Sequence, residues 1–444
     1  MNAVKTFSRG GVHPEENKFS SRKSIREIPL PLQAIIPLGQ NLGAPAKPIV
    51  KKGDIVKVGQ LIGQGEAFIS SNIHSPYSGF VTKIDDVLDA SGYRRPAIFI
   101  QVDGDVWEET IDRSETLETE IKLNRKAIID RIKSSGIVGL GGATFPTHVK
   151  LIIPEEKKVE ALLINAVECE PYLTCDEALM LSKGEEIFVG IKILMKAVDT
   201  QRAVIGIERN KPEVIEYFDT IAKKYPEIEV QPLKVKYPQG GEKQLIKAVV
   251  NKEVPSGKLP LEVGCVVINV GSAFAVYEAV QKNKPLIDRI VTVTGKSIAE
   301  PSNFKVRFGV PTQTLIEAVG GLPHDSAKII SGGPMMGKAI ASPEIPIVKG
   351  SSGVLVMKET ESHRKTEQNC IRCAKCTVVC PMGLEPYLLS KVSKLEKYDM
   401  AETENILDCM ECGSCVYTCP AKIPLLDYIR TGKFKVSQII RSRN

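Results

Sequence analysis

The alternation of apolar and polar residues changes along the chain and predicts several separate structural units. Residues 51–84 alternate in short runs interrupted by glycines, which is typical of the strands of a small all-β barrel or sandwich. An apolar run from Val159 to Ile164 predicts a buried strand that leads into polar residues at its C-terminal end. Residues 288–321 alternate again and take a helical pattern after Pro311.

The most apolar window, Val263 to Tyr277, is too short to cross a membrane. It is flanked by Glu262 and Glu278 and falls short of the roughly 20 residues that a spanning helix needs. We therefore interpret it as a buried strand and turn. The first residues of the chain lack the apolar stretch of a secretory signal, so no such signal is expected.

Length and composition indicate an ordinary soluble protein of several domains. The 444 residues exceed a single core, and the usual domain size suggests about three or four domains. Hydrophobic residues make up 43% and charged residues 25%, as in common globular proteins. The net charge of +6 is too small to imply a nucleic-acid partner.

Two identical cysteine frames lie near the C-terminal end, and each follows the C-x2-C-x2-C-x3-C-P run of bacterial ferredoxins. They hold eight of the 11 cysteines: Cys370, Cys373, Cys376 and Cys380, then Cys409, Cys412, Cys415 and Cys419. Structural zinc prefers two C-x2-C pairs at longer separation, and disulfides need an oxidising compartment. Neither explains three cysteines in one C-x2-C-x2-C run, so the spacing predicts two 4Fe-4S clusters.

In two-cluster ferredoxins the fourth cysteine of each run binds the other cluster, which predicts a crosswise pairing here. One cluster would use Cys370, Cys373, Cys376 and Cys419, and the other Cys409, Cys412, Cys415 and Cys380. The two clusters would then be close neighbours. The remaining cysteines, Cys169, Cys175 and Cys265, are expected to be buried thiols in a reducing cytoplasm.

A glycine-dense turn within residues 134–150 could bring backbone amides close to a phosphate. It matches neither a Walker A loop nor the dinucleotide GxGxxG fingerprint, so alone it is a weak signal. Polar residues follow the strand at Val159 to Ile164, at the end where open α/β sheets bind ligands. They are Asn165, Glu168, Glu170, Asp176 and Glu177. The five histidines form no metal-binding spacing.

Three stretches, "GLGGATFPTHVK", "NAVECEP" and "YPQGGEKQL", resemble in order the flavin-binding subunit of NADH:quinone oxidoreductases. The resemblance implies that Gly139, Gly141, Gly142 and Lys150 hold the phosphate of non-covalent FMN. It implies that Asn165, Glu168 and Glu170 line the isoalloxazine and the nicotinamide of NAD(H). Further cofactor contacts carry over to Tyr237, Gly240, Gly241, Glu242 and Asn269. Val167 departs from the family, which has an aspartate there, and this puts one flavin contact in doubt.

The segment 51–84 is similar to lipoyl and biotin carrier domains, but the attachment lysine is missing. Ile69, in "GEAFIS", occupies the position of the modified lysine. A swinging arm is therefore not expected, and we interpret this unit as a structural or docking module. Residues 288–321 resemble the β-grasp domain that follows the flavin domain in the same oxidoreductases.

The whole order, beginning with "FSRGGVHPEENK" at Phe7 to Lys18, resembles the C subunit of the Rnf electron-transport complex. Two relatives compete with it. The quinone-reductase A subunit lacks the cysteine frames, and the microcompartment cobalamin reductase places its clusters before the β-grasp unit. The resemblance implies a multidomain α/β protein. In chain order its expected parts are an N-terminal arm (1–30), a lipoyl-like β barrel-sandwich (31–105), a linker (106–125), a Rossmann-like FMN/NADH-binding α/β domain (126–284), a β-grasp, SLBB-like domain (285–348), an α-helical ferredoxin-type domain with two 4Fe-4S clusters (360–430) and a basic tail (431–444).

The resemblance further implies a peripheral component of an ion-translocating ferredoxin:NAD+ oxidoreductase on the cytoplasmic face of the cell membrane. Electrons would pass between ferredoxin, the two clusters, FMN and NAD(H), while integral membrane subunits move Na+ or H+. Its partners would be those subunits and a ferredoxin-like B subunit. Two alternatives stay open: a cobalamin reductase flavoprotein, and a non-catalytic iron–sulfur relay, which the Val167 departure makes conceivable. The tail, with five basic and no acidic residues in "RTGKFKVSQIIRSRN", either favours an anionic membrane face or is a frayed soluble end.

Overall fold

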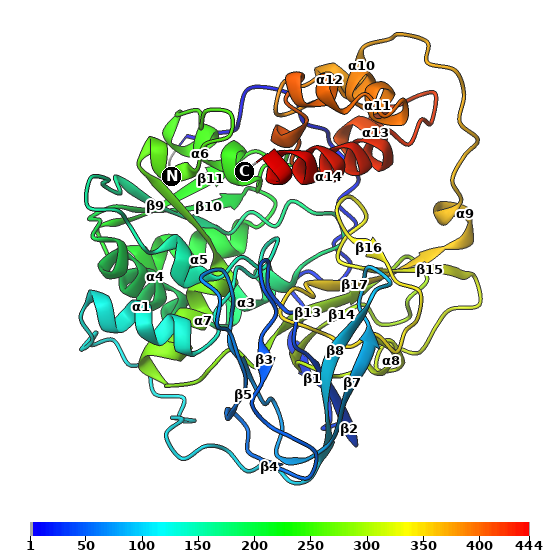
Figure 1. Cartoon of the computed structure of the whole chain (residues 1–444). Coiled ribbons are helices and arrows are strands. Elements are labelled where there is room, and N and C mark those ends of the chain that lie inside the picture. The colour runs from blue at the N-terminus through cyan, green and yellow to red at the C-terminus, as the bar shows by residue number, and fades with distance from the viewer. Residues whose placement is uncertain (1–2, 444) are drawn as a thin grey trace.

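The computed structural model describes residues 3–443 and arranges them as packed units (Figure 1). In Figure 1 the green unit and the yellow unit lie side by side, the blue strands lie below them, and the orange and red helices lie above. The dark blue N-terminal arm crosses from the green unit towards the orange and red helices.

The green unit is built on a parallel four-stranded sheet in the order β11-β10-β9-β12. Alternate residues of a strand face opposite sides, so Leu162 and Ile164 join a large apolar core while Ala161 and Leu163 join a smaller one. The strands are β9 (Ala161–Asn165), β10 (Ala203–Glu208), β11 (Ile228–Leu233) and β12 (Cys265–Asn269).

Helices cover both faces of this sheet. Those on the larger core are α1 (Arg125–Ser134), α3 (Cys175–Ser182), α4 (Gly184–Val198), α5 (Pro212–Ala222) and α7 (Val270–Gln281). The other face carries α6 (Glu242–Val250), beside the 3-10 turn η1 (Pro260–Val263), and Phe7 of the N-terminal arm. The short helix α2 (Thr147–Lys150) follows the glycine-rich turn.

The apolar window at Val263 to Tyr277 differs from its interpretation as a strand and turn. It forms the strand β12 and then enters the helix α7 directly. Asn269 causes the change, because its side chain accepts a hydrogen bond from the Gly271 amide and caps the helix. Among residues 3–443, no helix is both long enough and apolar enough to span a membrane.

Two small antiparallel sheets, in the orders β2-β8-β7-β4 and β3-β5-β6, form the predicted barrel-sandwich. Their strands are β2 (Gln33–Pro37), β3 (Lys47–Pro48), β4 (Ile55–Val56), β5 (Leu61–Gln64), β6 (Ile73–His74), β7 (Gly79–Leu88) and β8 (Arg94–Val102). Ile36 and Ile100 of this unit share one apolar core with Val293 and Phe304 of the neighbouring sheet. The two units are therefore packed as one body.

That neighbouring sheet is mixed and six-stranded, in the order β1-β14-β13-β17-β15-β16. It takes one edge strand from the N-terminal arm and continues beyond the predicted boundary at residue 348, because β17 pairs between β13 and β15. Its strands are β1 (Ile25–Glu27), β13 (Asp288–Thr294), β14 (Ser302–Arg307), β15 (Ser326–Ser331), β16 (Lys338–Ala339) and β17 (Gly353–Lys358). The helical pattern after Pro311 corresponds to α8 (Thr312–Glu317).

The C-terminal unit is helical and carries both cysteine frames. After α9 (Glu359–Ser362) it comprises α10 (Lys375–Val378), α11 (Pro386–Lys394), α12 (Tyr398–Thr403), the 3-10 turn η2 (Ile406–Asp408), α13 (Ser414–Thr418) and α14 (Leu425–Arg443). Leu389 of α11 and Ile406 join Ile429 and Val436 of α14 in its core.

The interpretation of residues 431–444 as a frayed basic tail is wrong for the described part, residues 431–443. These residues continue α14, because Ile429, Val436 and Ile440 recur at helical spacing and pack into the core of the unit. At the end of the helix, the Arg443 guanidinium bonds to the Glu402 carboxylate at 2.8 Å. The basic side chains therefore belong to a docked helix.

Lys349 joins three of these units through its buried ammonium group. The side chain is 1% exposed, and Nζ donates to the Asn72 carbonyl at 2.7 Å, the Gly136 carbonyl at 2.7 Å and the Ser71 hydroxyl at 3.2 Å. Burial lowers the pKa of Lys349 to about 7. A folded pKa below the unfolded value makes the folded state more favourable as pH rises between those two values.

We expect replacement of this lysine to change how stability depends on pH. In K349M the carbonyls of Asn72 and Gly136 lose their donor, which would cost about 1–3 kcal/mol of unfolding free energy. The native chain would also gain stability relative to K349M between about pH 7 and about pH 9, because only its unfolded state binds the extra proton. Denaturant unfolding at several pH values measures both effects. K338M, at an exposed lysine of β16, is the control, and a pH-independent difference would contradict the account.

Candidate functional site

Asn165 and Asn269 end two neighbouring parallel strands and stand opposite each other at the carboxyl edge of the sheet. The Asn165 amide donates to the Gly240 carbonyl at 2.8 Å. The Asn269 amide donates to the Asp176 carboxylate at 2.8 Å, and its oxygen caps α7. Both side chains are thus fixed where α/β sheets place their ligands.

The glycine-rich turn passes directly over this edge. A Cβ atom on Gly141 would lie 2.6 Å from Nδ2 of Asn269, so only glycine allows the approach. Nothing lies within 4 Å of a Cβ built on Gly142, and both glycines are exposed. The amide of Gly139 donates to the Phe145 carbonyl at 2.9 Å and closes the turn. The turn therefore has one face against the sheet edge and one face open.

Lys150 and Glu242 form an ion pair beside the turn. Nζ of Lys150 lies 2.6 Å from the Glu242 carboxylate and 3.2 Å from the Val267 carbonyl. Both side chains are about one-third exposed, at 32% and 39%. The structure thus brings together a lysine predicted to hold a phosphate and the first residue of α6, both at the edge of the sheet.

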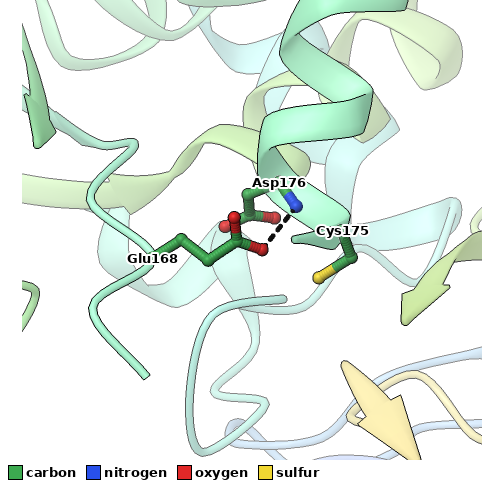
Figure 2. A group of neighbouring side chains, drawn as sticks. All are labelled: Glu168, Cys175 and Asp176. Carbon is green, nitrogen blue, oxygen red and sulfur yellow. Dashed lines mark hydrogen bonds between the residues drawn. The ribbon is translucent and has the colours of Figure 1, made fainter. Parts of the chain in front are cut away.

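The carboxylate of Glu168 points towards the beginning of the helix that carries Cys175 and Asp176 (Figure 2). It accepts hydrogen bonds from the backbone amides of Asp176 at 2.8 Å and Glu177 at 3.2 Å, in the first turn of α3. Asp176 is bonded to Asn269 in turn, and burial together with Glu168 raises the pKa of Asp176 to about 6. Glu168, Asp176 and the nearby Cys175 thiol form one group, and both carboxylates in it accept hydrogen bonds.

Glu170 reaches the loop between β15 and β16. Its carboxylate accepts the backbone amides of Met335 at 2.6 Å and Met336 at 3.1 Å, and burial raises its pKa. Met335 also packs in one apolar cluster with Tyr237 and Cys412. Glu170 therefore holds the β15–β16 loop between the sheet edge and the cysteine frames.

Tyr237 makes the direct link from the sheet unit to the second cysteine frame. Its hydroxyl donates to the Cys412 carbonyl at 2.8 Å, and the ring is almost fully buried. A Cβ on Gly241 would lie 2.7 Å from the Met410 side chain, and the Gln244 amide donates to the Pro381 carbonyl at 3.4 Å. The helical unit is thus docked on the beginning of α6.

The N-terminal arm seals the same junction. Val12 exchanges backbone hydrogen bonds with Tyr237 at 2.8 and 2.9 Å, and the Gly11 amide donates to the Val379 carbonyl at 2.8 Å. Gly10 and Gly11 have φ of +66° and +90°, which glycine adopts without strain. A Cβ on Gly10 would lie 2.6 Å from the carbonyl of Cys380. The paired glycines let the arm lie flat on the cysteine loop.

The eight frame cysteines fall into two groups of different burial. Cys380, Cys409, Cys412 and Cys415 line one pocket, together with apolar residues such as Leu389 and Ile429. Burial raises the pKa of the Cys409 thiol to about 11. Among the other four, Cys370 and Cys373 are exposed, Cys376 is half-buried and Cys419 is buried. The pocket with four thiols lies on the side that contacts Tyr237.

Sequence reasoning missed Lys18, Cys169 and the Met335 loop. Nζ of Lys18 donates to the carbonyls of Glu168 at 2.9 Å, Glu170 at 3.0 Å and Leu173 at 2.6 Å, so this lysine shapes the "ECEP" segment. The Cys169 sulfur accepts the Gly240 amide at 3.4 Å. Lys18 belongs to the N-terminal "GGVHPEENK" stretch, but only the fold brings it to this edge.

The departure at Val167 has a structural reason. The Val167 side chain is fully buried in the smaller apolar core with Phe7 and Leu163. Its backbone carbonyl accepts the Lys211 ammonium at 2.8 Å. The Val167 side chain therefore contributes to the apolar core beneath the carboxyl edge of the sheet, together with Phe7 of the N-terminal arm.

Four family models match successive parts of the chain. The matches are the RnfC barrel sandwich hybrid domain (residues 6–105), the Nuo51 FMN-binding domain (132–278), the SLBB domain (290–339) and a 4Fe-4S dicluster domain (363–420). They confirm the predicted multidomain α/β organisation with flavin-binding and dicluster domains.

Curated relatives extend the match to full length. The C subunit of the proton-translocating ferredoxin:NAD(+) oxidoreductase complex of Clostridium ljungdahlii is 45% identical over 96% of this chain and 93% of its own. The C subunit of the Na(+)-translocating ferredoxin:NAD(+) oxidoreductase complex of Acetobacterium woodii is 42% identical over 98% of each chain. The C subunit of the ion-translocating oxidoreductase complex of Rhodobacter capsulatus is 38% identical over 98% of this chain and 84% of its own. The chain belongs to this family of C subunits.

The fold of this C subunit is also shared with a chain of an NAD+-reducing NiFe-hydrogenase in the H2-reduced state. That likeness has a TM-score of 0.51 at 18% identity and covers 70% of this chain and 63% of the other. It concerns the fold alone.

A matched pair of glycine variants tests the seal made by the arm. Gly10 and Gly257 share a φ of +66°, but a Cβ on Gly257 meets nothing within 4 Å. Both alanine variants would strain the backbone by about 1–2 kcal/mol, and only G10A would also press on the Cys380 loop. We expect the iron–sulfur absorbance of G10A to bleach at a lower temperature on heating than that of G257A. Equal bleaching temperatures would show that the arm does not hold the cysteine loop.

Proposed function

We propose that this chain passes electrons between two 4Fe-4S clusters, FMN and NAD(H) as a peripheral component of an ion-translocating ferredoxin:NAD+ oxidoreductase. The observation that carries the proposal is the direct contact between the sheet edge and the four-thiol pocket, made by Tyr237 and Cys412. Bound FMN supplies the chemistry that joins them, because a flavin exchanges a hydride with a nicotinamide and single electrons with a cluster.

The glycine-rich turn fits an FMN phosphate. Gly141 must be glycine to approach Asn269, and the open space at Gly142 leaves room beside the backbone. Lys150 supplies a cation at the same edge, and Glu242 positions it through their ion pair. Asn165, Gly240 and Asn269 would line the flavin ring, since they form the adjoining sheet edge.

Glu168 and Glu170 would act in this site through the elements that they position. Glu168 caps α3 and thereby orients Asp176, which holds Asn269. Glu170 fixes the Met335 loop beside Tyr237. In both cases the carboxylate is engaged by backbone amides, so its contribution is the shape of the site.

The crosswise assignment of cluster ligands is supported by the four-thiol pocket. Cys380 from the first frame lies in it with Cys409, Cys412 and Cys415 from the second. The other cluster would use Cys370, Cys373, Cys376 and Cys419, and two of these four thiols, those of Cys370 and Cys373, are exposed. We assign the pocket cluster as the one next to the flavin and the exposed cluster as the one that faces partner subunits.

The order of the strands and the expected partner subunits fit the same role. The parallel order β11-β10-β9-β12 supports a Rossmann-like domain, and the mixed sheet around α8 supports a β-grasp domain. Integral membrane subunits and a ferredoxin-like B subunit would be the partners, at the cytoplasmic face of the membrane. The relatives are named for H+ or Na+ translocation, and such partners would carry the ion.

The alternative assignments are less well supported. A cobalamin reductase would place its clusters before the β-grasp unit, whereas the dicluster match at 363–420 follows the SLBB match at 290–339. The alternative of a non-catalytic relay depended on Val167, which replaces the family's aspartate. The Val167 side chain belongs to the apolar core beneath the sheet edge, which gives this replacement a structural reason.

An anaerobic NADH titration of the cluster-replete chain with FMN tests the proposed function. We expect the flavin and iron–sulfur absorbances to bleach together, because the sheet edge that would hold FMN adjoins the pocket whose thiols would hold a cluster. Bleaching by dithionite but not by NADH would overturn the nicotinamide site and leave a one-electron relay.

Single cysteine variants test the order of the two clusters. C370S would lose the exposed cluster, and NADH would still reduce the remaining one. C380S would lose the pocket cluster, and NADH would then reduce the exposed cluster far more slowly while dithionite still reduced it. Stopped-flow absorbance and iron content give both results. The opposite pattern would reverse the assigned order.

A further inference from the structure

The turn of the barrel-sandwich that carries the modified lysine in carrier domains is pinned here against the glycine-rich turn. Ile69 of this turn lies against Gly43, where a Cβ atom would be 2.2 Å from the Ile69 carbonyl oxygen. In the adjoining loop, the Leu42 amide donates to the Thr144 carbonyl at 3.2 Å, and the Ala44 amide donates to the Ile69 carbonyl at 3.0 Å. The barrel-sandwich turn therefore has a fixed position beside residues 139–145, as the blue strands β3 and β5 beside the green unit suggest (Figure 1).

The side chain of Phe68 is nevertheless 68% exposed. Leu42 and Ile69, on the two loops joined by that hydrogen bond, are also exposed apolar residues. Scattered apolar residues are normal on a surface, but three on adjoining rigid loops form a small apolar patch beside a candidate ligand site. Such a patch provides a flat surface for a ring without the cost of ordering a loop.

His148 of α2 is buried close to this patch. Burial, with a smaller contribution from the positive charge of Lys133, lowers the pKa of His148 to about 4. The imidazole ring of His148 is therefore neutral at neutral pH. Lys133 adds a cation close to the turn, which suits a neighbouring pyrophosphate.

The glycine-rich turn lies between this patch and the sheet edge. Gly141 approaches Asn269 closely on one side, and the Thr144 carbonyl accepts the Leu42 amide of the barrel-sandwich on the other. A dinucleotide with its nicotinamide over the sheet edge would extend across the turn towards Phe68.

We propose that Phe68 stacks against the adenine ring of NAD(H), so that the barrel-sandwich domain completes the dinucleotide site. This inference rests on the proposed function and adds the residue that recognises the adenylate half of the substrate. It also gives a role to the barrel-sandwich turn in which Ile69 replaces the attachment lysine. This turn would form a fixed side of the dinucleotide site, and Phe68 would supply its aromatic ring.

The test compares two substrates that differ in the adenylate half. In F68A we expect the KM for NADH to rise roughly tenfold or more, because base–aromatic stacking is lost, while kcat with a dye acceptor stays unchanged. With reduced nicotinamide mononucleotide, which lacks adenine, F68A and the native chain would have the same KM. F68W would restore the KM for NADH. F80A, at another exposed phenylalanine of the barrel-sandwich, is the control and would leave every constant unchanged.

A binding measurement gives a readout that does not depend on turnover. Calorimetric titration with ADP-ribose, which keeps the adenylate half, would show weaker binding to F68A than to F80A. An unchanged KM for NADH in F68A, or an equal rise for both substrates, would overturn the role of Phe68. Absence of NADH oxidation by the native chain would instead overturn the proposed function, so the two failures are distinguishable.

Discussion

The hydrogen bond from the Tyr237 hydroxyl to the Cys412 carbonyl marks the contact on which the rest of the structure depends. It joins the edge of a parallel sheet to a pocket lined by four thiols, and each neighbouring element serves to hold these two surfaces together. α6 begins at this point, the Met335 loop closes one side through Glu170, and the arm closes another through Gly10 and Gly11. The proposed hydride site and the proposed one-electron site would therefore be neighbours at this junction.

The remaining units act as a rigid support for the sheet unit. The barrel-sandwich and the six-stranded sheet share one apolar core, and Lys349 ties both to the residue that precedes the glycine-rich turn. A unit with the shape of a mobile carrier is thereby fixed. The presence of Ile69 in place of the attachment lysine is consistent with this rigidity, since the Ile69 carbonyl is bonded to Ala44 and its turn could not swing.

Much of this organisation was predictable because its signals are local. Cysteine spacing identifies the two cluster frames, and the glycines of the turn and of "GGEK" identify a close backbone approach. Other features depend on contacts between distant residues and left no local pattern. Lys18 reads as a surface lysine until the fold surrounds it with three carbonyls, and β17 joins its sheet only through strands far earlier in the chain. The prediction of a frayed basic tail was wrong because it relied on the charge of the C-terminal residues. The helical spacing of Ile429, Val436 and Ile440 indicates the packed helix that the structure shows.

The position of the arm has a consequence for the order of assembly during synthesis. Phe7 and Gly11 precede every strand of the sheet unit in the chain, yet the Gly11 amide bonds to the carbonyl of Val379, which is made after that unit. Domains generally fold in order from the N-terminus, so the sheet unit can form before the loop at Val379, which the arm contacts, has been made. The arm can close over this junction only after the cysteine frames have emerged, so a segment translated before the sheet unit is fixed in place after it.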